Sequence, residues 1–403
     1  MFETWQKQVD SYFSPDKLNE FIELTKTLVN MDSFTYDGED VNAVGECVTS
    51  WLAARGFSVQ KLPRTFADTD EPWMKGVGNV FMARSHPAEA GAGVVFLGHL
   101  DTVFPRGTVK ERPFSIQGDR AMGPGVDDMK GGVVMNMMAA AALKELGLLD
   151  FPVTLVFSCD EEMGAPTSTR TYAPLLKGAV AALVTEPGTP GGGVTTQRKG
   201  SGHVHMCVTG KMGHSSRDYK TGASAILDLA HKIVDLDKLV DFDKEILVNT
   251  GLVAGGISPG TIAPDADARI HLSYVHMDEG ERLMEGVRAV AATTYVPGTT
   301  TILEGGLRLP PLEPTQKGGE LFAMAERAAA SIGMKLNPIF AKGASEAGFT
   351  STRLGIPSLC GLGPEGTLLH SDKEYLLLPT VLPRCKMLTL TAIQAAKAFM
   401  AAR

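Results

Sequence analysis

Basic stretches are missing from this sequence of 403 residues, which carries a formal net charge of −8 at pH 7. Proteins that bind nucleic acid usually present a basic face, and anionic membranes attract clusters of lysine and arginine. We therefore expect neither nucleic acid nor a membrane surface as a partner.

Long apolar runs are missing as well. The most apolar stretches, 94–103 and 133–143, are interrupted well short of the ~20 residues that cross a bilayer. The N-terminus, MFETWQKQVD, has early acids and no apolar core of a secretory signal. Cysteine is scarce and shows no paired spacing, which favours reduced thiols and a cytoplasmic location. The five cysteines are Cys47, Cys159, Cys207, Cys360 and Cys385.

The chain is longer than the size at which one hydrophobic core stops growing, so two domains are expected. With 44% hydrophobic and 21% charged residues, its composition is that of an ordinary globular protein. The first ~60 residues have apolar positions at helical spacing. After them, solid apolar runs alternate with helical segments, which predicts a mostly parallel sheet covered on both faces. The strand-like runs are GVVFLGHLDTVF, PVTLVFSCDEE, AVAALVTEP and GIPSLCGLG.

The middle of the chain differs, because its strands alternate between apolar and polar residues. The segments GHVHMCVTG, EILVNTGLV and ADARIHLSYVH predict a sheet with one open face, and two helices lie among them, at 223–235 and 279–293. A final helix is expected from Pro383 to the C-terminus. We therefore divide the chain into a first catalytic segment (1–199), an inserted α+β domain (200–307) and a second catalytic segment (308–403).

Acids and histidines follow the predicted parallel strands, at the edge where open α/β sheets bind ligands. Each could be explained singly as a turn or a helix cap. Five such groups in succession are hard to explain by capping alone. The groups are His99 with Asp101, Asp127 with Asp128, Asp160 with Glu161 and Glu162, Glu186, and His370.

Two histidines and three carboxylates form a donor set that suits a pair of zinc-like ions. A carboxylate that bridges two ions would hold them ~3.5–4 Å apart. Three acids after one buried strand would repel one another without a cation or solvent to compensate.

The ordered motifs are H-x-D, G-x-G-x-x-D-x-K-G-G, D-E-E-x-G, E-P and G-x-x-x-H-S. They resemble the zinc-dependent family of glutamate carboxypeptidase, aminoacylase, acetylornithine deacetylase and succinyl-diaminopimelate desuccinylase, and most of all glutamate carboxypeptidase. The resemblance implies an α/β di-zinc peptidase domain, mostly parallel in its sheet, with an inserted ferredoxin-like domain for dimerisation or lid closure. Cobalt or manganese could replace zinc.

The resemblance also implies residue roles. Asp128 would bridge the two ions, with His99 and Glu186 on one ion and Glu162 and His370 on the other. Asp101 would orient His99, and Glu161 would be the general base.

A histidine of the inserted domain, His214, would stabilise the oxyanion. In the family this histidine usually reaches the partner subunit's site, so the resemblance implies a homodimer through the inserted domain.

The substrate-binding positions depart from the family. Gly260 stands where relatives carry asparagine, and Ser273 where they carry the arginine that grips a carboxylate. The substrate-binding candidates that remain are Arg308, Gly343 and Ser345. In the loop from Gly343, Glu346 and Gly348 replace the family's Asp and Asn.

The leading hypothesis is a dimeric di-zinc hydrolase of an amide bond in a small peptide or N-acyl amino acid. The departures suggest a less anionic or bulkier substrate than a C-terminal glutamate peptide. A deacylase or desuccinylase of an amino-acid intermediate is one alternative. A non-catalytic binding descendant is another, although such a protein would tend to lose the base or a ligand.

Overall fold

The larger unit of the protein is built around a six-stranded sheet, seen in a computed structural model that describes residues 2–68 and 70–402. The order is β1-β2-β6-β3-β7-β16, and the last four strands run parallel. The strands are β1 (Ser58–Leu62), β2 (Val80–Arg84), β6 (Val153–Ser158), β3 (Gly93–His99), β7 (Ala179–Val184) and β16 (Ser358–Leu359). The four parallel strands are the four solid apolar runs of the sequence, so the predicted α/β fold is confirmed.

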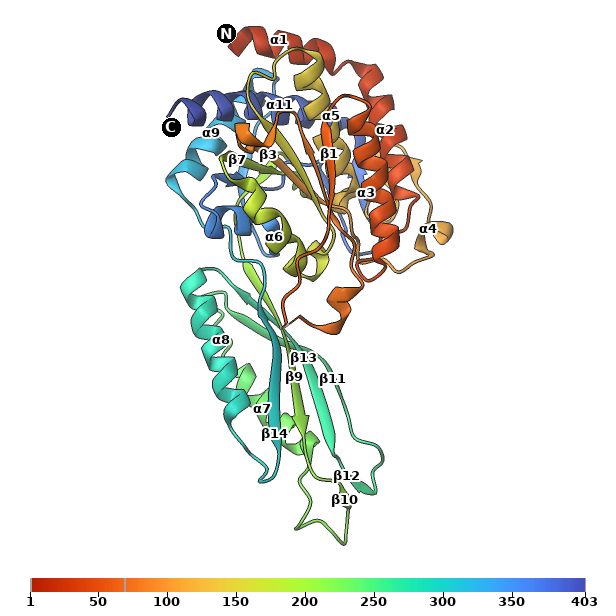
Figure 1. Ribbon diagram of the computed structural model, residues 1–403, viewed down its shortest axis with the longest axis vertical. Helices are drawn as coiled ribbons and strands as arrows, with labels where there is room; N and C mark the ends of the chain where they lie inside the picture. The colour runs from red at the N-terminus through yellow and green to blue at the C-terminus, as the bar shows by residue number, and fades with distance from the viewer. Residues whose placement is uncertain (1, 69, 403) are drawn as a thin grey trace.

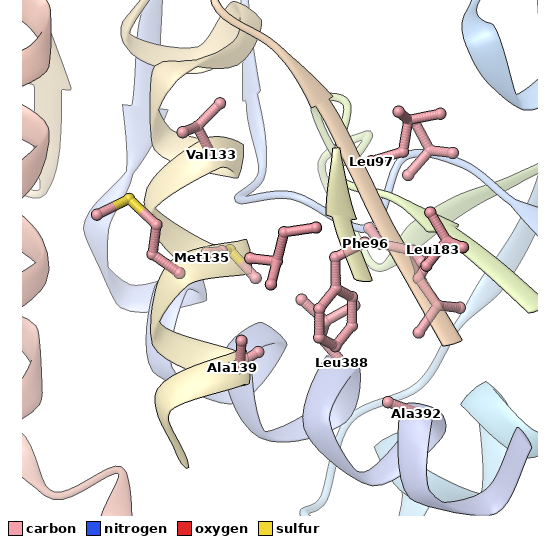
Figure 2. Close-up of a cluster of buried hydrophobic side chains, with 14 of the residues drawn as sticks. Phe96, Leu97, Val133, Met135, Ala139, Leu183, Leu388 and Ala392 are labelled. Carbon is pink, nitrogen blue, oxygen red and sulfur yellow. The ribbon is translucent and has the colours of Figure 1, made fainter. Parts of the chain in front are cut away.

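Helices pack around this sheet because its central strands are apolar on both faces. Every residue of β3, β6 and β7 is buried. Figure 2 shows Phe96 of β3 between Val133 and Ala139 of one helix and Leu388 of another. The main helices are α1 (Phe2–Tyr12), α2 (Pro15–Val29), α3 (Gly38–Ala53), α5 (Gly132–Glu145), α6 (Pro166–Tyr172), α9 (Gln316–Ser331) and α11 (Leu378–Ala401).

The smaller unit extends away from the larger one and carries an antiparallel sheet, as Figure 1 shows. Its strand order, β11-β13-β9-β14, and its βαββαβ succession are those of a ferredoxin-like fold. Its elements are β9 (Gly200–Thr209), α7 (Ala225–Asp237), β11 (Leu247–Gly255), β13 (Asp265–Tyr274), α8 (Met277–Ala292) and β14 (Thr300–Leu307).

The alternating strands of this unit leave one face open, as predicted. Val204, Met206 and Val208 of β9 are buried in a cluster that includes Leu229 of α7 and Leu283 of α8. The residues between them, at 203, 205 and 207, are only partly buried and lie on the other face.

Two elements of the structure differ from what the sequence predicted. The strand β14 was not predicted, because Gly305 and Gly306 interrupt its apolar pattern. The helix α11 begins at Leu378 rather than at Pro383, which lies inside it. Pro379, within the first two positions of the helix, is a residue that favours a helix start, so the helix begins five residues earlier than predicted.

Among residues 2–68 and 70–402, no helix combines the length and apolarity that a membrane crossing requires.

Candidate metal centre

The parallel strands deliver the predicted ligands to one edge of the main sheet. The strand β3 ends at His99, β6 ends just before the 3₁₀ turn Glu161–Met163, and β7 ends just before Glu186. Asp128 lies in the turn Val126–Gly131 that precedes α5. Their proximity follows from the parallel topology, because carboxyl ends of parallel strands share an edge.

Two groups of possible metal ligands form here, and they share Asp128. His99 Nε2 lies 3.1 Å from Asp128 Oδ1 and 3.9 Å from Glu186 Oε1. His370 Nε2 lies 3.3 Å from Asp128 Oδ2 and 3.2 Å from Glu162 Oε2. Within each group the donor atoms are within 4.8 Å of one another. Asp128 therefore presents one oxygen to each group, as a bridging carboxylate does.

The charges of this cluster are strongly coupled. Hydrogen bonds to Asp128 and Glu162 raise the pKa of His370 to about 11. Burial would raise the pKa of Asp128, but hydrogen bonds from His370 and His99 outweigh it and lower that pKa. Burial and repulsion by Asp128 raise the pKa of Glu162 to about 7.

This chemistry fits a pair of divalent cations. The Glu162 Oε1 atom is buried and has no hydrogen-bond partner among the described residues. An unpartnered carboxylate oxygen in a buried site is costly unless a cation satisfies it. The oxygen and nitrogen donors are those that zinc and similar ions prefer.

Asp101 connects the predicted base to the histidine ligand. Its carboxylate accepts hydrogen bonds from the backbone N–H groups of Glu161 (3.2 Å) and Glu162 (3.3 Å) and from the Thr35 hydroxyl (2.8 Å). The Nδ1 atom of His99 lies 2.9 Å from the backbone carbonyl of Asp101 and 3.5 Å from its carboxylate. Asp101 thus contacts both His99 and the turn that carries Glu161.

The environment of Glu161 makes its carboxylate a stronger proton acceptor than an ordinary glutamate. Burial, followed by repulsion from Glu186, raises its pKa well above the ordinary value of a glutamate. A general base works best when its pKa lies near the working pH.

Glu374 supports the Asp128 turn and was not identified from the sequence. Its carboxylate accepts hydrogen bonds from the backbone N–H groups of Gly125 (3.1 Å), Asp127 (2.8 Å) and Asp128 (3.0 Å). The residue precedes the short strand β18 (Tyr375–Leu377), far along the chain from the turn. Only the fold brings these segments together, and no local pattern signals it.

A cavity of about 510 Å³ opens onto the metal centre. Gly343, one of the predicted substrate-binding residues, lines it, as do three residues that the sequence did not suggest: Arg198, His203 and His271. The Arg198 guanidinium donates from Nε to the Gly343 carbonyl (2.8 Å) and from Nη1 to Cys360 Sγ (2.9 Å). It is therefore a fixed positive charge at the cavity wall.

The other two predicted substrate-binding residues lie outside that cavity. The guanidinium of Arg308 bonds to the buried Glu71, so it is paired within the protein. Ser345 is buried and caps a short turn, with its hydroxyl 3.3 Å from the Ala347 nitrogen. Arg308 and Glu71 line a second, neighbouring cavity instead.

His214 lies far from the metal centre of its own chain. It belongs to β10 (Gly213–His214), which pairs with β12 (Thr261–Ile262) near the end of the inserted unit remote from the main sheet (Figure 1). Its side chain is exposed. One chain by itself does not bring His214 to the site.

A second cavity of about 470 Å³ adjoins the first, and both are lined by His203 and His271. It lies between the larger unit and the open face of the inserted sheet. Its wall includes Tyr36, Trp73, Met163 and Leu252. Met163 directly follows the ligand candidate Glu162, so the two cavities meet beside the metal centre.

Sequence comparison identifies the family. The model of peptidase family M20/M25/M40 matches residues 95–394. The chain belongs to this family. It is 24% identical over 378 residues to carboxypeptidase G2 of Pseudomonas sp. (strain RS-16), covering 92% of this chain and 87% of the relative. It is 28% identical to a succinyl-diaminopimelate desuccinylase of Gluconobacter oxydans, covering 59% of this chain and 64% of the relative.

Solved structures of peptidases share the fold of this chain. A tripeptidase of Staphylococcus aureus superposes with a TM-score of 0.74 at 18% identity, covering 94% of this chain and 99% of the other. A dinuclear metal binding peptidase of the M20 family from Bacillus subtilis has a TM-score of 0.64 at 15% identity, covering 96% and 100%. The expected family and the expectation of a metal-dependent hydrolase acting on amide or peptide bonds are both confirmed.

Proposed function

We propose that this protein hydrolyses an amide bond in a small peptide or N-acyl amino acid, with two zinc ions held by His99, Asp128, Glu162, Glu186 and His370. The observation that carries this proposal is the pair of ligand groups joined at Asp128. Bound ions would polarise the scissile carbonyl and lower the pKa of the attacking water.

The protein's own groups complete the reaction. Glu161 accepts the proton of the attacking water and donates it to the leaving nitrogen, a role that suits its raised pKa. Asp101 positions both the Glu161 backbone and the His99 ring.

The substrate is proposed to be bulkier than a simple glutamate peptide. The second cavity supports this, because Tyr36 and Trp73 pack edge to face at its wall with ring centroids 5.5 Å apart. A large apolar or aromatic group of the substrate would fit beside them. Arg198 supplies positive charge at the metal cavity, where relatives use the arginine that Ser273 replaces.

A homodimer through the inserted domain is proposed as the working form, in the cytoplasm. The outer face of α7 exposes Ile226, Leu227 and Val234, with 46, 48 and 60% of each residue accessible. The neighbouring edge strand β11 exposes Leu252 and Val253. Exposed apolar side chains on a helix and on a neighbouring edge strand support such an interface, because a partner subunit would cover them.

A hydrolysis screen tests the proposal. The panel contains N-acyl amino acids and dipeptides with small or aromatic groups, each with a free or a blocked carboxylate. We expect turnover that chelation abolishes and that zinc, cobalt or manganese restores. Turnover by fully chelated protein would refute the mechanism, and a preference for small substrates would refute the role of the second cavity.

A further inference from the structure

The open face of the inserted sheet carries a second set of metal-binding side chains. His205 and Cys207 are two residues apart on β9, so they lie on the same face. Glu304 of β14 is directly opposite His205, and Asp267 of β13 is directly opposite Cys207. Three adjacent strands therefore bring four donor side chains together, none of which belongs to the metal centre described above.

The donors lie close enough together to share one ion. His205 Nδ1 lies 3.1 Å from Glu304 Oε2 and 3.5 Å from Cys207 Sγ. The sulfur is also 3.4 Å from Nε2 of the same ring, so a rotation of the Cys207 side chain would direct it to the Nδ1 side. In a tetrahedral site, bonds of about 2.1 Å to nitrogen and 2.3 Å to sulfur place those two donors about 3.5 Å apart. One donor atom from each of these three residues lies within 4.8 Å of the other two.

Asp267 occupies the place of a supporting carboxylate. Its Oδ2 lies 2.9 Å from Nε2 of His205, the ring nitrogen that faces away from Glu304. Histidines that bind metal commonly donate their other N–H to a carboxylate, which fixes the ring and its tautomer. The positive charge of Arg269, which lies opposite His205 on β13, does not neutralise Glu304 and Asp267, because Arg269 pairs with Glu71 at 3.3 Å.

An ion pair alone explains less of this arrangement. A protonated His205 between two carboxylates would account for Glu304 and Asp267, but it gives no role to the sulfur beside the ring. A coordinating cation would displace the proton of the Cys207 thiol and bind the thiolate.

We propose that His205 Nδ1, Cys207 Sγ and Glu304 form a third metal site, for zinc or a similar borderline ion, with Asp267 orienting His205. The thiolate, imidazole and carboxylate donors select such ions over magnesium or calcium. Three protein ligands leave one position of a tetrahedral ion open to solvent or another ligand.

Cobalt substitution of the full-length protein tests this site independently of the hydrolase. The protein is stripped with a chelator and titrated with Co²⁺. None of the ligands proposed for the metal pair is a cysteine, so a thiolate-to-cobalt charge-transfer band reports only a site that contains sulfur. We expect this band in the wild type and its loss in Cys207→Ser, which should bind one ion fewer and keep its hydrolase activity.

The control is Cys47→Ser, which removes another partly buried thiol and should keep the band. Asp267→Asn should retain the band but weaken cobalt binding by ~10–100-fold. Absence of the band in the wild type would overturn the proposal, and so would a band that survives Cys207→Ser.

Discussion

The metal centre and the open face of the inserted sheet collect similar side chains in different ways. At the metal centre, the ligands follow separate strands or lie in distant turns, and four of the five are buried or nearly so. On the inserted sheet, neighbouring strands supply the donors by simple alternation, and Asp267 and Glu304 remain 40 and 45% exposed. Buried charges depend strongly on one another, whereas exposed charges are screened by solvent. Substitutions should therefore have large, linked effects in the first region and smaller, separate effects in the second.

The largest effect is expected from Glu161→Gln. The amide cannot accept the proton of the attacking water, so kcat should fall by ~10²–10⁴-fold or more. The ligands themselves are unchanged, so metal analysis should still find two ions in the catalytic centre. Unchanged turnover would remove Glu161 as the base, and loss of the ions would make it a structural residue.

The next largest effect is expected from His214→Ala. The family resemblance implies that His214 stabilises the oxyanion, and loss of such a donor should lower kcat by ~10²–10³-fold and leave metal content unchanged. Since His214 lies at the far end of its own chain, the residue should act in the partner's site.

A mixture of two inactive variants separates action across the dimer from action within one chain. Dimers formed from His214→Ala and Glu161→Gln subunits contain one site with both groups if the histidine crosses to the partner. Recovery of activity on mixing supports that arrangement. Continued inactivity of a verified mixed dimer contradicts it.

The difference between the two regions also explains what the sequence could predict. Three of the proposed ligands, His99, Glu162 and Glu186, could be suggested from the sequence because they follow solid apolar runs, and parallel strands end at a common edge. Asp128 and His370 lie in turns and were suggested by their motifs. Glu374 and Arg198 were missed because their roles arise from contacts between distant segments. The pairing of Arg308 with Glu71 was invisible for the same reason.

The inserted sheet gave a different outcome. Alternation predicted which residues share a face, but it could not show that Glu304 lies opposite His205, because β14 itself was not predicted. Strand register is fixed by the complete sheet, not by any one strand.

A smaller effect on stability is expected from Glu346→Gln. Burial raises the pKa of Glu346 to about 8, although the Ser158 hydroxyl donates to it at 2.6 Å. The unfolded chain releases this proton near pH 4.5, whereas the folded protein keeps it up to about pH 8. Stability from this group is therefore complete below pH 4.5 and is lost as the pH rises toward 8.

The neutral amide removes this dependence. Urea unfolding of the chelated protein between pH 5 and pH 8 should show a loss of a few kcal/mol in the wild type that is reduced in Glu346→Gln. Parallel pH profiles for the two proteins would mean that Glu346 is ionised in the fold.

The smallest effect compares one buried carboxylate from each region. Glu374 accepts three backbone N–H groups of the turn that holds Asp128, and Asp228 of α7 accepts those of Tyr295 (2.8 Å) and Val296 (2.9 Å). In Glu374→Gln the amide N–H₂ group replaces an oxygen that accepts backbone N–H groups. In Asp228→Asn the N–H₂ group comes to lie beside the ammonium of Lys232, which is 3.2 Å from Asp228 Oδ2. Both variants should therefore lower the melting temperature.

Only Glu374→Gln should also weaken zinc binding at the metal pair, by ~10–100-fold, because its partners position the bridging ligand. Competition with a zinc indicator measures this affinity in both variants. An equal loss of affinity in Asp228→Asn would show that general destabilisation weakens zinc binding. An unchanged affinity in Glu374→Gln would show that the Asp128 turn keeps its shape without the carboxylate.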